Sequence, residues 1–165
     1  MLKKDKQGTR ANKSGKNLED NVEFYLCDNF DIVSKQYRNW FNSKETETSK
    51  GTLLKNVPYI NIYGGNCRGE FVLSCNGRKD IRIECRKQTV SGSVDEKFPY
   101  FFANAVTFEE QNVLLVVEGD GYKFGAKEWL RDSVNAVKHK NILMLSFEEF
   151  KEWANNELKE FKNEE

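Results

Sequence analysis

Two short segments, residues 70–75 (EFVLSC) and 80–88 (DIRIECRKQ), carry the side chains best suited to chemistry. Both alternate between two kinds of residue, a pattern typical of β-strands that bury one face. Asn76-Gly77 lies between them and predicts a turn. By alternation, one face of the second strand carries Asp80, Arg82, Glu84, Arg86 and Gln88. The sequence therefore predicts a β-hairpin with a row of charged and polar side chains.

The register of this hairpin decides which charges meet. A two-residue turn with regular pairing would place apolar side chains of the first strand beside charges of the second. A three-residue loop, or an equivalent bulge, instead pairs Phe71 with Ile83 and sets Glu70 directly opposite Glu84. Because this register matches the two apolar faces, we expect the Cβ atoms of the two glutamates to lie ~5 Å apart.

Two carboxylates at that distance repel each other unless a cation lies between them. We therefore expect Glu70 and Glu84 to bind a hard divalent ion. Mg²⁺ is the expected ion, and Mn²⁺ could replace it. Arg86 would place a fixed positive charge beside that ion, where it suits a phosphate that gains negative charge, and Gln88 would extend the row. The alternative is that Glu84 and Arg86 form solvated cross-strand pairs on an ordinary exposed sheet face.

The rest of the chain must hold this hairpin in place. Residues 1–16 contain six Lys or Arg and one acid, and predict a flexible basic arm that is either solvated or contacts phosphates. Residues 17–165 are long enough for one domain, and the zero net charge of the chain neither favours nor excludes a nucleic-acid partner. The patterns predict helices near 17–30, 93–106, 126–137 and 146–161, and strands near 31–38, 59–63, 70–75, 80–87, 112–118 and 141–145. This order predicts an α/β fold, a mixed sheet with helices on both faces.

At these residues the sequence resembles the PD-(D/E)XK, or restriction-endonuclease-like, nucleases. The stretch Glu84-Cys85-Arg86 matches the (D/E)xK part of their motif, and residues 118–129 resemble their later strand, turn and helix. The resemblance makes Glu70 the first acid, Glu84 the second, Arg86 the occupant of the lysine position and Glu19 the glutamate of the first helix.

Two departures from the family pattern affect the predicted chemistry. Glycine, not proline, precedes the first acid, which is a glutamate, and the motif lysine is an arginine, which cannot act as a base. Lys97, near the start of the next helix, could bring an ammonium group back to the site, although a lysine in a first helical turn is often only solvated.

The resemblance implies a Mg²⁺-dependent DNA endonuclease, of the type II restriction-like or phage-encoded kind, that works as a homodimer. DNA phosphates would then be followed by the basic arm and by the region of Arg68, Lys79 and Arg82. The alternative is a catalytically degenerate nuclease fold that binds DNA or protein. A cysteine hydrolase lacks support, because His139 would have to be its only base.

The four cysteines are far apart and form no CxxC pair, so they predict reduced thiols and not a zinc site. No N-terminal apolar segment of the signal-peptide kind and no apolar run of membrane-spanning length is present in the sequence. We therefore expect a soluble protein in the cytoplasm.

Overall fold

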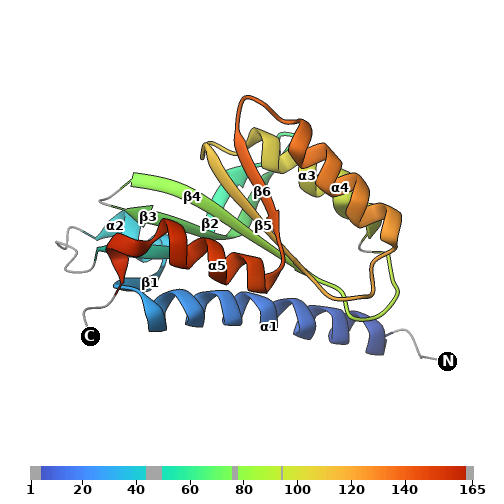
Figure 1. Cartoon of the computed structure of the whole chain (residues 1–165), viewed down its shortest axis with the longest axis horizontal. Helices are drawn as coiled ribbons and strands as arrows, with labels where there is room; N and C mark the ends of the chain where they lie inside the picture. The colour runs from blue at the N-terminus through green and yellow to red at the C-terminus, as the bar shows by residue number, and fades with distance from the viewer. Residues whose placement is uncertain (1–4, 44–49, 76–77, 94, 163–165) are drawn as a thin grey trace.

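A computed structural model describes residues 5–43, 50–75, 78–93 and 95–162 (Figure 1). Its centre is a six-stranded mixed sheet with the spatial order β1-β2-β3-β4-β5-β6. Strands β2, β3 and β4 form the predicted antiparallel meander, while β1 pairs with β2, and β5 with β4 and β6, in parallel. The strands are β1 Ile32–Gln36, β2 Gly51–Ile60, β3 Asn66–Cys75, β4 Arg78–Lys87, β5 Asn112–Glu118 and β6 Asn141–Leu145.

Helices cover both faces of this sheet, as the sequence predicts for an α/β fold. In Figure 1, α1 (Asp5–Asn29) and α5 (Phe147–Glu157) lie along one face, and α3 (Phe98–Thr107) and α4 (Phe124–Ala136) along the other. The short α2 (Tyr37–Asn42) connects β1 to β2, and the 3₁₀ turns η1 (Asp95–Lys97) and η2 (Lys159–Phe161) precede α3 and follow α5. No helix in the described ranges is both long and apolar enough to span a membrane.

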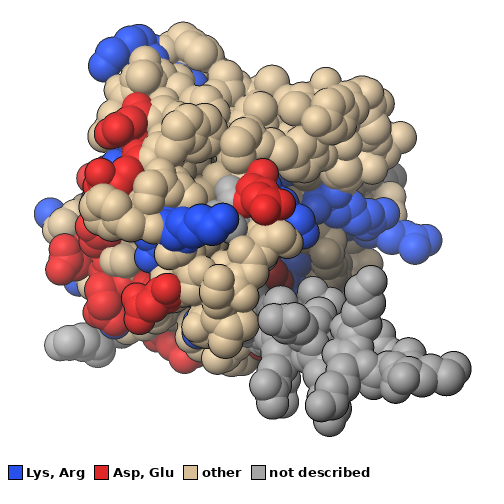
Figure 2. All heavy atoms as spheres, turned by 90° about the vertical axis from the view of Figure 1, so that its right-hand side faces the viewer, with Lys and Arg blue, Asp and Glu red and all other residues tan. Residues whose placement is uncertain are grey.

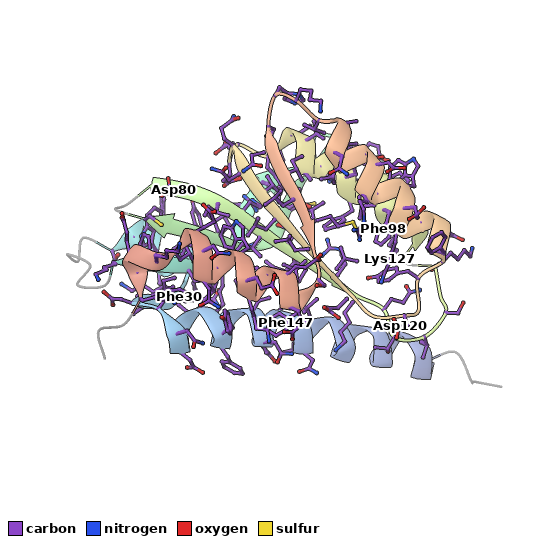
Figure 3. All side chains as sticks on the ribbon, in the orientation of Figure 1. Phe30, Asp80, Phe98, Asp120, Lys127 and Phe147 are labelled. Carbon is purple, nitrogen blue, oxygen red and sulfur yellow. The ribbon has the colours of Figure 1, made fainter. Side chains whose placement is uncertain are left out.

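Each helical layer has its own apolar core. Under α1 and α5, the α1 residues Leu18, Val22 and Leu26, and Phe30 just after the helix, recur every fourth position and are almost fully buried against the sheet. Each such side chain stabilises the fold by roughly 1.5–3 kcal/mol. Figure 3 places Phe30 and Phe147 in this layer and Phe98 in the opposite one. Because β5 supplies both cores, its apolar run is continuous rather than alternating.

Several predicted boundaries match the structure. Strands β5 and β6 have the predicted bounds, and the capping box at the start of α5 is formed: Glu149 N donates to Ser146 Oγ (3.2 Å), and Ser146 N donates to Glu149 Oε2 (2.7 Å). The four cysteines are free thiols, as expected. These features depend on residues close together in the sequence, which is why sequence patterns report them.

Other boundaries differ from the prediction. The first helix begins at Asp5, so it takes in most of the segment predicted as a basic arm, while residues 1–4 of that segment lie outside the described residues. Strand β2 starts at Gly51 and ends at Ile60, because Asn61 Oδ1 accepts hydrogen bonds from Tyr63 N and Gly65 N and so forms a turn. Likewise, α3 starts at Phe98, after the 3₁₀ turn, and not at the predicted capping box.

The hairpin β3–β4 has the predicted apolar pairing, and a bulge produces it. Phe71 pairs with Ile83 and Leu73 with Ile81, but the next pair joins Ser74 to Lys79. Asp80 is therefore the extra residue, and its Oδ2 accepts a hydrogen bond from Cys75 N (3.1 Å). This one residue sets the register of β4 and hence the direction in which Glu84 points.

Candidate active site

A cleft of about 930 Å³ opens between α1, the β3–β4 hairpin and the start of α3. Five of the six predicted site residues line it: Glu19 from α1, Glu70 from β3, Glu84 and Arg86 from β4, and Lys97 from the end of η1. The fold thus brings together residues that are up to 78 positions apart in the sequence (97 minus 19).

Glu70 lies next to the point where the paired register of β3 and β4 ends, one residue before Phe71. Its Oε2 accepts a hydrogen bond from the backbone N–H of Cys85 (3.2 Å), and its Oε1 accepts one from Arg86 Nη1 (2.7 Å). Burial alone would raise the pKa of Glu70, but a hydrogen bond from Glu84 and the charge of Arg86 outweigh burial and lower it. Glu70 is therefore ionised at neutral pH.

The pKa of Glu84 is shifted in the opposite direction. Its side chain is only 3% exposed, and burial, followed by the negative charge of Glu70, raises its pKa well above the ordinary carboxyl value. A proton shared by the two acids therefore favours Glu84 over Glu70. Glu84 Oε1 is also buried without a hydrogen-bond partner among the described residues.

Arg86 connects the acid pair to the open cleft. Its Nη1 donates to Glu70 and to the carbonyl oxygen of Cys85 (2.6 Å), and its guanidinium lies over the ring of Phe101, 4.4 Å from the centroid. The side chain is 34% exposed, so a ligand in the cleft can reach it. With Glu84 buried and Arg86 bound to Glu70, the alternative of solvated cross-strand pairs on an open sheet face is wrong.

The other predicted site residues differ in their surroundings. Glu19 is half-buried, and burial, followed by the charge of Glu70, raises its pKa to about 7. Lys97 is exposed at the cleft. Gln88 does not line the cleft; its Nε2 donates to the carbonyl of Gly121 (2.8 Å) and so holds the turn after β5.

Simple alternation fails close to the acids, and Gly69 shows how. A Cβ at Gly69 would lie far inside van der Waals contact with Glu84 Oε1, so Gly69 faces the buried carboxyl. Val57, which pairs with Gly69, packs with Leu54. Simple alternation would put these two side chains, three residues apart, on opposite faces of β2. The break coincides with Asn56, whose φ of 55° is left-handed. A period of two cannot reveal such a break.

Arg82 and Glu110 are the residues that sequence reasoning misjudged or missed. We expected Arg82 to follow DNA phosphates, but it is 2% exposed and its guanidinium binds the buried carboxylate of Glu110, so that expectation is wrong. Arg82 is buried because other side chains cover this face of β4; the ring centroid of Phe108 lies 4.6 Å from Arg82 Cζ. Glu110 lies between α3 and β5, and no sequence signal marked it.

The site can accommodate a divalent cation with two protein ligands. Within the described part of the chain, no three His, Cys, Asp or Glu side chains are arranged to hold a metal ion. Mg²⁺ often uses only one or two carboxylates and keeps several waters, which suits Glu70 and Glu84. The Glu70–Glu84 pair fits such an ion, because a cation could take the place of the proton through which the two carboxyl groups are hydrogen-bonded to each other.

The mixed sheet with helices on both faces, and two acids and a basic residue on its central hairpin, define the class of protein. A family model for the PD-(D/E)XK nuclease superfamily domain matches residues 10–158 of this chain. The chain therefore belongs to the PD-(D/E)XK nuclease superfamily. No curated protein and no solved structure matches it.

Proposed function

We propose that this protein is a Mg²⁺-dependent endonuclease that hydrolyses phosphodiester bonds in DNA, with Mn²⁺ able to replace Mg²⁺. The observation that carries the proposal is the contact between the buried Glu84 and the ionised Glu70, two carboxyl groups that meet in an open cleft. A surface that only binds an anion gains nothing from paired carboxylates without a metal. Membership of the superfamily supports nuclease activity.

Each cleft residue has a role in this proposal. Glu70 and Glu84 would hold the cation, which when bound supplies positive charge against the phosphate and makes a nearby water more acidic. Arg86 would bind a phosphate oxygen and, being permanently charged, cannot take a proton. Glu19, with a pKa of about 7, is suited to accepting a proton at neutral pH. Lys97 would contact the DNA backbone.

The basic residues around the cleft support DNA as the substrate. Lys16, Arg68, Lys87 and Lys97 line the cleft, and with residues 1–16 they would neutralise phosphates. Figure 2 shows Lys and Arg gathered across the centre and right of one end of the molecule, with Asp and Glu mainly at its left. On this face the basic and acidic side chains are therefore partly separated. Because the described part of each chain offers one candidate site, a homodimer would supply one site for each strand of a duplex.

The direct test is cleavage of supercoiled plasmid by wild-type protein and Glu84→Ala in Mg²⁺, Mn²⁺ or EDTA. We expect the wild type to nick or cut with either metal, and no cutting with EDTA or with Glu84→Ala. Metal-independent DNA binding without any cutting would instead support the degenerate, non-catalytic alternative.

Replacement of Arg86 by glutamine should separate metal binding from catalysis. We expect the rate at saturating Mg²⁺ to fall by roughly 10²–10³-fold, because a positive charge against the reacting phosphate is lost. Mg²⁺ should bind at least as tightly as to the wild type, because a cation beside Glu70 has been removed. Calorimetry with Mg²⁺ and single-turnover cleavage measure the two effects. Arg86→Lys, which keeps the charge, should retain part of the rate; equal losses in both variants would contradict the role.

Binding of Mg²⁺ should release the proton that the two acids share. Burial raises the pKa of Glu84, so its proton persists above the ordinary carboxyl value of 4.5 and must leave when the cation binds. Mg²⁺ affinity should therefore rise with pH, by about tenfold per unit for one displaced proton, until Glu84 ionises unaided. Calorimetry in two buffers of different ionisation enthalpy counts the protons released. Affinity that is independent of pH would contradict the shared proton.

A further inference from the structure

The residue directly behind the acid pair is a buried arginine. Arg82 lies two residues before Glu84 on β4, and the two side chains are 2% and 3% exposed. A buried guanidinium loses its hydration, which costs several kcal/mol unless other groups replace the water. The groups that surround Arg82 therefore indicate what it does.

Two of its nitrogens are held by one carboxylate. Arg82 Nε donates to Glu110 Oε2 (3.0 Å) and Nη2 donates to Glu110 Oε1 (3.2 Å), a two-pronged contact that fixes the plane of the guanidinium. The rings of Phe108 and Tyr59 lie 4.6 and 5.6 Å from Arg82 Cζ. The guanidinium therefore has one defined orientation.

The third nitrogen, Nη1, is directed at Glu84. It lies 3.5 Å from Glu84 Oε1, and neither atom has a hydrogen-bond partner among the described residues. Gly69 leaves the space in which they meet, since a Cβ there would be 2.5 Å from Nη1. A charge-assisted N–H···O bond is usually about 2.7–2.9 Å long, so a shift of under about 1 Å would form it.

We infer that Arg82, held by Glu110, is a positioning residue that orients the Glu84 carboxylate toward a divalent cation. The inference rests on the proposed metal role of Glu84. Each acid then has its own arginine: Arg86, exposed to the cleft, binds Glu70, and the buried Arg82 faces Glu84. Arg82 is buried and does not line the cleft, so it acts on the acid pair through its contact with Glu84.

A purely structural ion pair is the competing explanation, and the two make different predictions. A buried pair that serves only stability can often be replaced by apolar residues without loss. Breaking such a pair by changing one partner would alter the thermal midpoint of the protein and leave its affinity for Mg²⁺ unchanged. A positioning residue changes the affinity even where the fold is intact, because the orientation of a metal ligand by its neighbours affects binding by about 10–100-fold.

The test compares Arg82→Lys, which keeps the charge but not the planar fork, with Glu110→Gln, which keeps the shape but not the charge. Both should weaken Mg²⁺ binding by about 10–100-fold in calorimetry without DNA. They should also raise the Mg²⁺ concentration for half-maximal cleavage more than they lower the rate at saturating Mg²⁺. Val134→Ala is the matched control, because it removes buried volume from the same helical layer away from the acids. It should lower the thermal midpoint and keep wild-type affinity.

The outcomes separate this inference from the proposed function. If the wild type binds Mg²⁺, Glu84→Gln does not, and both test variants bind like the wild type, the positioning role is overturned and the nuclease proposal stands. If the wild type neither binds Mg²⁺ nor cuts DNA, the proposed function fails first. Side-chain ¹⁵N NMR of Arg82 in the wild type needs no variant: Mg²⁺ should shift its guanidinium signals, and unchanged signals would also overturn the role.

Discussion

Replacing Glu84 with glutamine is expected to lower the rate of DNA cleavage in Mg²⁺ by roughly 10²–10³-fold, because loss of a group that stabilises transition-state charge has about this effect. Glutamine has the shape of the protonated carboxyl that Glu84 carries without metal, and its amide can still donate to Glu70. The contact between Glu70 and Arg86 is untouched. The variant should therefore lose metal binding and keep its fold.

The stability of this variant should depend on pH in a defined direction. The raised pKa means that folded Glu84 keeps its proton to a higher pH than the unfolded chain, in which the carboxyl ionises near 4.5. The contribution of Glu84 to stability is therefore fully present below pH 4.5 and is lost as pH rises toward its raised folded pKa. Glutamine has no such loss, so metal-free Glu84→Gln should gain stability relative to the wild type as pH rises. Thermal unfolding in EDTA at several pH values measures this difference.

Glu109→Gln is the matched control for Glu84→Gln. It makes the same chemical change on an exposed residue that does not line the cleft. It should cleave DNA and unfold like the wild type. A Glu84→Gln protein that still cuts DNA at the wild-type rate would remove Glu84 from the proposed metal site.

Gly69→Ala is expected to destabilise the protein by roughly 1–3 kcal/mol, the usual cost of overfilling a well-packed interior. The added methyl would overlap Glu84 Oε1 and lie 2.5 Å from Arg82 Nη1, so the ends of both side chains would have to move. Relief requires displacement of the Glu84 carboxyl. Cleavage should therefore fall by roughly 10²-fold, because small misplacements of reacting groups have effects of that size.

Gly125→Ala is the matched control for this substitution. Gly125 lies in α4, and a Cβ there meets nothing within 4 Å. Alanine should stabilise the helix by roughly 0.5–1 kcal/mol and leave cleavage unchanged. Thermal unfolding and plasmid cleavage of both variants provide the comparison. Wild-type cleavage by Gly69→Ala would mean that the Glu84 carboxyl has freedom that its close contacts do not indicate.

Features that depend on local periodicity could be predicted from the sequence. The four-residue spacing of Leu18, Val22 and Leu26 places α1 on the sheet, and the apolar run of β5 indicates burial on both faces. The pairing of Phe71 with Ile83 followed from matching apolar faces, and both Glu70 and Glu84 line the same cleft. These features need only short-range patterns and the preference of apolar faces for each other.

The surroundings of the acids could not be predicted in the same way. That Arg82 is buried depends on Phe108 and Glu110, which lie more than 25 positions away in the sequence (108 minus 82 is 26). The facing of Gly69 toward Glu84 coincides with a left-handed backbone at Asn56, which no local sequence pattern marks. Burial of a charged residue becomes favourable only once its partners are in place, and sequence patterns contain no information about those partners.

The bulge at Asp80 has a consequence for how this hairpin tolerates changes in chain length. Asp80 is the extra residue between the pairs Leu73–Ile81 and Ser74–Lys79, so its deletion would leave the hairpin free to pair without interruption. The later residues of β4 would then keep their partners on β3, Leu73 with Ile81 and Phe71 with Ile83, and so keep their faces of the sheet. Loss of the bulge with Asp80 retained would have the opposite effect, because regular pairing from the turn would set Leu73 opposite Asp80 and turn Glu84 to the other face. The hairpin should therefore tolerate deletion of Asp80 better than a change that forces Asp80 into the paired register.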